Sequence, residues 1–177
     1  INTLEFEHIA SAIAAFIRVK FAVRETRFHE FVFGGGSIDE DEVAGGLIFY
    51  GKGRCASCHS GPLLSYLDLH AIPFVQAGFG KNGFGVDYGR FNVTRDADDL
   101  YKFRTPPLIN VTRTGPWTHS GAISELGQTI RMHIDPLSDY TGTARTARQR
   151  REDLARLAVS LQSEDIPEPL SDGEIDD

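Results

Sequence analysis

The sequence is poor in several residue types that would otherwise mark a class of protein. Its 177 residues include only two cysteines, one methionine and one tryptophan. Two cysteines three positions apart cannot form the disulfide framework of a small secreted scaffold. No apolar run approaches the ~18 residues of a membrane-spanning helix, so we expect no transmembrane segment. The sequence opens at Ile1 without a signal peptide.

Positive charge is also scarce. Lys and Arg together number 18 against 25 Asp and Glu, which gives a formal net charge of −7. Nucleic acids and anionic membranes select for surfaces rich in Lys and Arg, so neither is an expected partner. Apolar residues make up 41% of the chain, which suffices for a packed core in one ordinary domain or two small ones.

Hydrophobic periodicity predicts a mainly α chain. Apolar residues recur at helical spacing from Glu5 to about Lys20. Ser37 to Glu40 has the form of a capping box and opens a second helix that runs to Tyr50. A third helix after Ser124 carries Leu126, Ile130, His133 and Ile134, and a fourth covers about 147–162.

The rest of the chain is predicted to be less regular. Residues 60–100 are rich in Gly, Asp, Asn and aromatics without lasting periodicity, so we expect a long irregular segment with at most short strands. Pro167 and Pro169 mark a linker, and Ser171 to Glu174 forms another capping box close to the end. This predicts a C-terminal helix that is cut off after residue 177.

The two cysteines belong to one short motif. Cys55-Ala56-Ser57-Cys58-His59 has the spacing of c-type haem attachment, in which two thiols bond one porphyrin edge and the following histidine ligates the iron. Structural zinc needs four ligands and the chain has no further cysteines, while a redox dithiol needs a βαβ context that is missing. We therefore predict one covalent haem c, around which residues 60–100 wrap.

A second axial ligand could come from six residues. His133 lies on the same helical face as Leu126 and Ile130 and so points towards the core, whereas Met132 is rotated from it by about 100°. A lone histidine on an apolar face is more often a core residue than a ligand, but a haem needs a partner. The candidates are His8, His29, His70, His119, Met132 and His133.

Residues 101–121, YKFRTPPLINVTRTGPWTHSG, resemble the signature of the bacterial di-haem cytochrome c peroxidase/MauG family. The continuation of the CxxCH motif into Ser60-Gly61-Pro62 is similar as well. Residues 2–4, leading into 9–16, resemble the helix that begins the second haem domain of that family. The resemblance covers nearly the whole chain.

The resemblance implies a fold and a domain organisation. Members have two c-type haem domains, one peroxidatic and one, the C-terminal domain, that relays or stores electrons. Residues 1–177 resemble only the C-terminal one, as a single cytochrome c-like domain with long irregular connections. Because haem is attached to such motifs outside the bacterial inner membrane, we expect a periplasmic or otherwise exported protein whose signal peptide is not in this chain.

The resemblance also assigns ligands. The family's distal ligand lies fourteen residues beyond the signature histidine, here His119, which leads to His133. Peroxidases of the family usually have Met there and MauG has Tyr, so bis-histidine ligation is implied, with Met132 or His70 as the alternatives. The family also binds Ca²⁺ between its domains. Backbone carbonyls of Thr114 and Pro116 are the implied ligands, unless this segment is a plain turn.

Several neighbouring residues are given supporting roles. Trp117 either packs the haem pocket or lies between redox centres, and His119 is expected to donate a hydrogen bond rather than ligate. Buried propionates need cationic partners, for which the candidates are Arg95, Lys102, Arg104 and Arg113.

The functional prediction is electron transfer. Six-coordinate bis-histidine iron has no open site for peroxide, so no catalytic residue is assigned here. The chain is expected to be the electron-relay domain of a peroxidase-family oxidoreductase whose catalytic haem lies elsewhere, on a second haem domain or subunit. A small redox protein would donate or accept its electrons. The alternatives are a non-enzymatic c-type cytochrome subunit of a larger redox complex, and a haem domain with a purely structural role.

Overall fold

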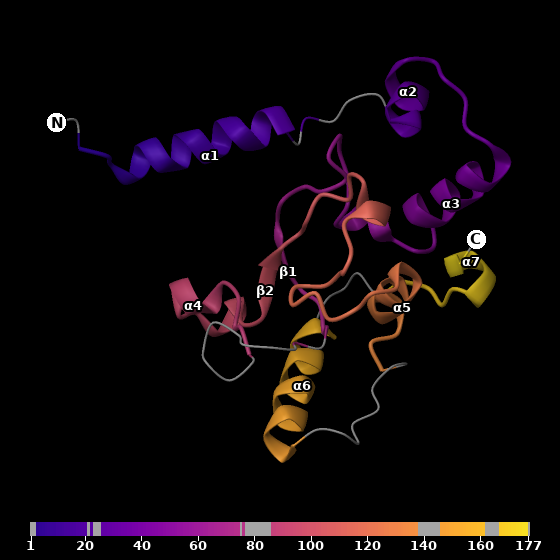
Figure 1. Cartoon of the computed structure of the whole chain (residues 1–177). Coiled ribbons are helices and arrows are strands. Elements are labelled where there is room, and N and C mark those ends of the chain that lie inside the picture. Colours follow the sequence, from indigo (N-terminus) through magenta and orange to yellow (C-terminus); the bar gives the residue numbers. More distant parts are fainter. Residues whose placement is uncertain are drawn as a thin grey trace. The chain divides into compact units, whose positions relative to one another are not determined.

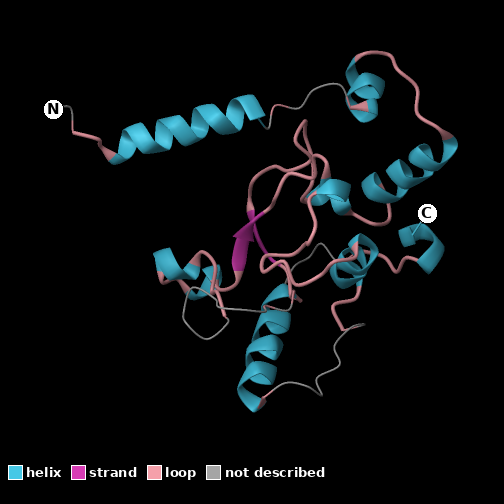
Figure 2. Cartoon of the chain, in the orientation of Figure 1, coloured by secondary structure: helices cyan, strands magenta, loops and turns pink. Residues whose placement is uncertain are grey.

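The computed structural model describes residues 3–20, 22, 26–74, 76, 86–137, 146–161 and 167–176. The chain divides into two units, Ile1–Asp39 and Glu40–Asp177, and each is described by itself. Helices predominate over strands in the described residues (Figure 2). The mainly α prediction is therefore confirmed.

The first unit contains two helices. α1, Phe6–Lys20, starts within one residue of its predicted beginning, and none of its side chains is buried. α2, Arg27–Phe33, was not predicted. Thr26 caps it, because its Oγ1 accepts a hydrogen bond from the His29 N–H at 3.2 Å, and the Gly34 N–H donates to the Glu30 carbonyl at 2.9 Å to end it.

The second unit carries the remaining helices, which Figure 1 labels. None of the helices in the described ranges is long and apolar enough to span a bilayer. Its α-helices are α3 Glu40–Tyr50, α4 Phe91–Thr94, α5 Leu126–Ile134, α6 Ala147–Ser160 and α7 Asp172–Asp176, and its 3-10 turns are Cys55–Ser57, Ala97–Asp99 and Val111–Arg113.

Two of these helices differ in extent from the prediction. α3 begins at Glu40, later than the capping box at Ser37 implies. α6 ends at Ser160, and Gln162 lies outside the described residues. The final capping residues do lead into a helix, since the N–H and the Oγ of Ser171 both donate to Glu174 Oε2 at 2.9 Å at the start of α7.

Two short strands join segments that are distant in the sequence. β1, Leu69–Ala71, pairs antiparallel with β2, Lys102–Arg104, and His70 lies opposite Phe103. Gly89 runs alongside β2 with φ +62°, where a Cβ atom would collide with the Lys102 carbonyl. The pairing thus holds the segment after the CxxCH motif against the signature segment.

The core of the second unit is small and partly polar. Its buried apolar side chains among the described residues are Val86, Tyr101, Ile123 and Met132. Buried polar side chains accompany them, namely Ser65, Thr105, Thr129, Asp153 and Arg156. Of these, Ser65 donates to the Thr105 carbonyl at 2.8 Å, which ties the loop after the CxxCH motif to the residue following β2.

Candidate haem-binding site

A tight turn presents the CxxCH motif. After α3 the Gly53 N–H donates to the Ile48 carbonyl at 2.9 Å, and a Cβ at Gly53 would come within 2.9 Å of that carbonyl and 3.4 Å of Cys55 Sγ. The 3-10 turn at Cys55 follows, with the His59 N–H bonded to the Cys55 carbonyl at 2.8 Å. The backbone between the cysteines is therefore coiled, as bonding of both thiols to one porphyrin edge requires.

The two cysteines are half-buried free thiols. Burial raises the pKa of the Cys55 thiol, and the neighbouring Cys58 adds to this effect. Among the described residues no group of three or more His, Cys, Asp or Glu side chains is placed to hold a metal ion. The described residues thus offer no four-ligand set for structural zinc.

His59 is held in one orientation by the loop that follows it. Its Nδ1 lies 3.0 Å from the Leu64 carbonyl, and the loop returns because the Ser65 N–H donates to the Ser60 carbonyl at 2.8 Å. With the Nδ1–H as donor, Nε2 carries the lone pair. Desolvation lowers the pKa of His59, although its backbone hydrogen bonds oppose the shift. The ring is therefore neutral and suited to ligation.

His133 repeats this arrangement on α5. Its Nδ1 lies 2.8 Å from the Thr129 carbonyl one turn earlier, and its ring meets Phe74 edge-on with centroids 4.8 Å apart. The side chain is accessible to solvent, yet surrounding protein lowers its pKa by desolvation, and His59 lowers it further. The two imidazoles are thus close enough to interact electrostatically.

The alternative ligands are placed differently. Met132 is 3% exposed and packs in the core. His70 Nε2 is hydrogen-bonded to the Tyr66 hydroxyl, and His119 has its Nε2 3.1 Å from Asp87 Oδ2. His8 and His29 belong to the other unit. A neutral imidazole with Nδ1 held by a carbonyl is found at His59 and His133, so the donor chemistry fits a haem iron between them.

The predicted calcium turn follows a 3-10 turn. Thr114, Gly115 and Pro116 are exposed, and Thr114 Oγ1 donates to the Val111 carbonyl at 3.2 Å. Trp117 packs against this turn, with its Nε1–H bonded to the same carbonyl at 2.9 Å. The backbone carbonyls of Thr114 and Pro116 stay a predicted calcium site.

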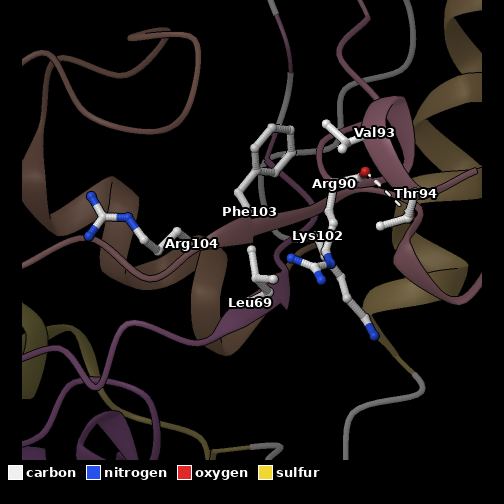
Figure 3. Close-up of a pocket in the computed structure, with 7 residues that line it drawn as sticks. All are labelled: Leu69, Arg90, Val93, Thr94, Lys102, Phe103 and Arg104. Carbon is white, nitrogen blue, oxygen red and sulfur yellow. Dashed lines mark hydrogen bonds between the residues drawn. The ribbon is translucent and has the colours of Figure 1, made fainter. Parts of the chain in front are cut away.

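Two of the propionate candidates line a hollow of about 350 Å³ (Figure 3). Lys102 and Arg104 lie there with Arg90, which the sequence reasoning missed. Arg90 pairs with Asp99 at 3.1 Å, whereas Figure 3 shows Arg104 extending away from the other two cations. Arg95, by contrast, lies over the Phe91 ring at 5.8 Å. The apolar floor is formed by Leu69, Val93 and Phe103, and Thr94 completes the lining.

Two polar pairs were also missed, and no local pattern points to them. The Tyr66–His70 pair joins the irregular segment to β1. The His119–Asp87 pair spans 32 residues, and the His119 ring stacks on Phe103 with centroids 3.9 Å apart. His119 is therefore hydrogen-bonded in the structure.

No protein-family model matches the chain, but individual proteins do. It is 27% identical over 163 residues to cytochrome-c peroxidase IdrP1 of Pseudomonas sp. (strain SCT), covering 76% of this chain and 42% of that protein. It is 29% identical over 130 residues to cytochrome c551 peroxidase of Pseudomonas aeruginosa, covering 72% and 36%. It is 27% identical over 164 residues to methylamine utilization protein MauG of Methylorubrum extorquens, covering 89% and 44%.

A solved structure agrees on the fold. A MauG-like protein associated with microbial copper homeostasis superposes with a TM-score of 0.61 over 94% of this chain and 62% of its own, at 23% sequence identity. The cytochrome c-like fold prediction is therefore confirmed. The chain spans less than half the length of the curated relatives described above. These relatives, together with the CxxCH motif, support assignment of the chain to the bacterial di-haem cytochrome c peroxidase/MauG family.

Proposed function

We propose that this chain is the electron-relay domain of a di-haem peroxidase- or MauG-like oxidoreductase, and that it binds one covalent, bis-histidine c-type haem. Similarity to cytochrome c peroxidases and MauG supports a haem-based redox role. The bis-histidine proposal rests on two imidazoles that are held in the same way. His59 Nδ1 lies 3.0 Å from one backbone carbonyl oxygen, and His133 Nδ1 lies 2.8 Å from another.

Each residue has a defined part. A bound c-type haem supplies a one-electron iron couple whose potential depends on its axial ligands. The Cys55 and Cys58 thiols fix one porphyrin edge. The carbonyls of Leu64 and Thr129 orient the two rings and make them more basic ligands. Phe74 limits rotation of the His133 ring by its edge-on contact.

Two histidine ligands leave no coordination position for a substrate. The domain would then carry electrons, while peroxide or another substrate reacts at a haem outside this chain. This organisation requires a second haem domain or subunit, together with a small redox protein that donates or accepts electrons. Covalent attachment of a c-type haem would imply a periplasmic or otherwise exported protein. A Ca²⁺ ion on the Thr114 and Pro116 carbonyls would stiffen the junction with the second domain.

Ligand variants test the axial assignment. In the haem-loaded protein we expect His133→Ala to convert the low-spin ferric optical and EPR spectra to high-spin, because the sixth position opens. Met132→Leu is the matched control. It changes the neighbouring side chain at similar volume and should leave the spectra low-spin. A low-spin spectrum that survives His133→Ala and is lost in Met132→Leu or His70→Ala would overturn the bis-histidine assignment.

The denatured intact mass of the native protein tests the domain assignment, because covalent haem survives denaturation. A mass that carries two haems supports the relay domain of a di-haem enzyme. A mass of one haem on a chain of this length contradicts it and favours the non-enzymatic electron carrier.

A further inference from the structure

Tyr66 and His70 form a hydrogen-bonded pair next to the CxxCH turn. The Tyr66 hydroxyl is hydrogen-bonded to His70 Nε2, and the two ring centroids lie 5.6 Å apart with an interplanar angle of 42°. In the His70 tautomer that carries its proton on Nδ1, the phenol is the donor and Nε2 is the basic acceptor. His70 Nε2 is committed to this bond, so none of the roles assigned above uses it.

The backbone fixes both partners. The Tyr66 N–H donates to the Cys58 carbonyl at 3.4 Å, directly beside the haem-attachment residues. Ser65 before it is buried, and its Oγ donates to the Thr105 carbonyl and accepts from the Leu67 N–H at 3.1 Å. His70 is held in β1 opposite Phe103. The pair is therefore preorganised rather than a chance contact of a free loop.

The pair connects the protein surface with the candidate haem site. Tyr66 is 44% exposed, so a partner can reach its ring from solvent. On the other side, the Tyr66 N–H donates to the Cys58 carbonyl at 3.4 Å, within the haem-attachment motif. A tyrosine with a base at its hydroxyl, between an exposed surface and that motif, is placed to exchange electrons with both.

We propose that Tyr66 is a redox-active tyrosine, with His70 as its proton acceptor, through which an oxidising equivalent passes between the haem site and a partner at the surface. This inference rests on the proposed function in one respect. Its physiological oxidant is a one-electron acceptor of high potential, the class to which a peroxide-oxidised haem belongs.

The step balances without any further reagent. The O–H bond of Tyr66 breaks and its proton forms an N–H bond at His70 Nε2, which gives an imidazolium. One electron passes from the phenol to the oxidant, whose oxidation state falls by one, and a neutral tyrosyl radical remains. An electron from a donor at the surface reverses the step and returns the proton to the phenolic oxygen. Without His70, the proton would have to leave to water and the oxidation would be harder.

The test uses the haem-loaded protein with an external oxidant, photogenerated tris(bipyridine)ruthenium(III), followed by freezing and EPR. We expect a tyrosyl radical signal in the parent protein and its loss in Tyr66→Phe. Tyr50→Phe is the matched control. Tyr50 is 56% exposed and contacts Phe49 rather than a histidine, so its replacement should leave the signal in place.

A second measurement separates a redox role from a structural one. The rate of Tyr66 oxidation should slow in D₂O when the proton moves to His70, and His70→Gln should abolish this isotope effect while circular dichroism stays unchanged. Retention of the radical in Tyr66→Phe, or an unchanged rate and isotope effect in His70→Gln, would overturn the proposal. Because the ruthenium oxidant replaces the second haem, these outcomes are independent of whether the relay function is correct.

Discussion

At the scale of single residues, Tyr101 links the signature segment to α6. It is 5% exposed and has φ +59°, and its hydroxyl donates to Glu152 Oε2 at 3.0 Å. Its ring packs edge-on against Tyr88 with centroids 5.7 Å apart. Burial and the neighbouring Glu152 carboxylate raise the pKa of Tyr101 far above its usual range, so the phenol is protonated and able to donate at neutral pH.

Removing this hydroxyl should weaken the fold without changing its packing. We expect Tyr101→Phe to lower the free energy of unfolding by about 1 kcal/mol, the usual net contribution of one hydrogen bond. Urea denaturation followed by circular dichroism measures the change. Tyr50→Phe serves as the control, since Tyr50 is exposed and its variant should unfold like the parent. Equal unfolding free energies for the two variants would show that the Glu152 bond contributes nothing.

The CxxCH residues could be predicted from sequence because their chemistry requires a fixed local spacing. The position of His133 on a helix could be predicted from the apolar periodicity around it, and α5 does carry it, while its role as an axial ligand stays a prediction. The partners of these residues could not be predicted. Asp87 meets His119 across 32 residues, and Thr105 accepts from Ser65 across 40, distances over which no periodic pattern operates.

At the scale of elements, α6 has a complete capping box. Thr146 Oγ1 accepts from the Gln149 N–H at 3.2 Å, and the Thr146 N–H donates to Gln149 Oε1 at 2.9 Å. We expect Thr146→Ala to destabilise the protein by about 1 kcal/mol, because the first turn of the helix loses its cap. Thr146→Ser keeps the hydroxyl and should lose much less. Thermal unfolding of the three proteins measures the order, and an equal loss in both variants would contradict it.

Charged contacts fasten the short helix α7. Arg131 on α5 pairs with Asp172 at 3.2 Å and Asp176 at 2.6 Å, and Lys52, just before the CxxCH turn, pairs with Glu174. The Lys52 carbonyl also accepts from the Glu168 N–H at 3.1 Å. α7 thereby contacts both segments that carry the candidate axial ligands.

The ion pair with Lys52 and hydrogen bonds from Ser171 lower the pKa of Glu174 to about 2. A lowered folded-state pKa means that the ionised carboxylate stabilises α7 above its ordinary pKa, and that this contribution is lost as pH falls towards 2. We expect Lys52→Gln to move the titration midpoint of Glu174 upwards, measured by the carboxyl carbon chemical shift in NMR. A midpoint that stays at its parent value would show that Lys52 does not set it.

Which elements could be predicted depended on their length. α1, α3, α5 and α6 repeat their apolar residues over several turns, so periodicity revealed them. α2 has seven residues and α4 has four, which is too few turns for a periodic signal. β1 and β2 have three residues each and are defined by their pairing with one another. This pairing depends on long-range contact rather than on local sequence.

At the scale of the whole molecule, the described residues bury few apolar side chains. The four buried ones contrast with many large apolar side chains that are exposed, including Leu47 at 71% and Tyr66 at 44%. Folded chains of this size normally bury enough apolar surface to offset the conformational entropy they lose. A covalently bound porphyrin would add the missing apolar contacts, so stability should depend on its attachment.

We expect the Cys55→Ala/Cys58→Ala double variant, which cannot form thioether bonds, to lose its near-UV circular dichroism and to bind the dye ANS, as proteins do when fixed packing is lost and secondary structure remains. His133→Ala keeps both thioethers and is the matched control, and it should retain the near-UV signal. A double variant that still unfolds cooperatively with an unchanged near-UV spectrum would contradict this dependence.

The proximity of His70 to His59 has a consequence for the order in which the chain acquires its structure. His70 lies 11 residues from His59 and His133 lies 74 away. Closing the shorter loop in an unfolded, haem-attached chain costs about 1.7 kcal/mol less entropy. Early in folding, His70 would thus reach the iron ahead of His133. Binding of His70 to the iron would be a kinetic trap, because it keeps His133 from the sixth position. Tyr66 competes for the same nitrogen of His70, so the native hydrogen bond between them would release the chain from this trap.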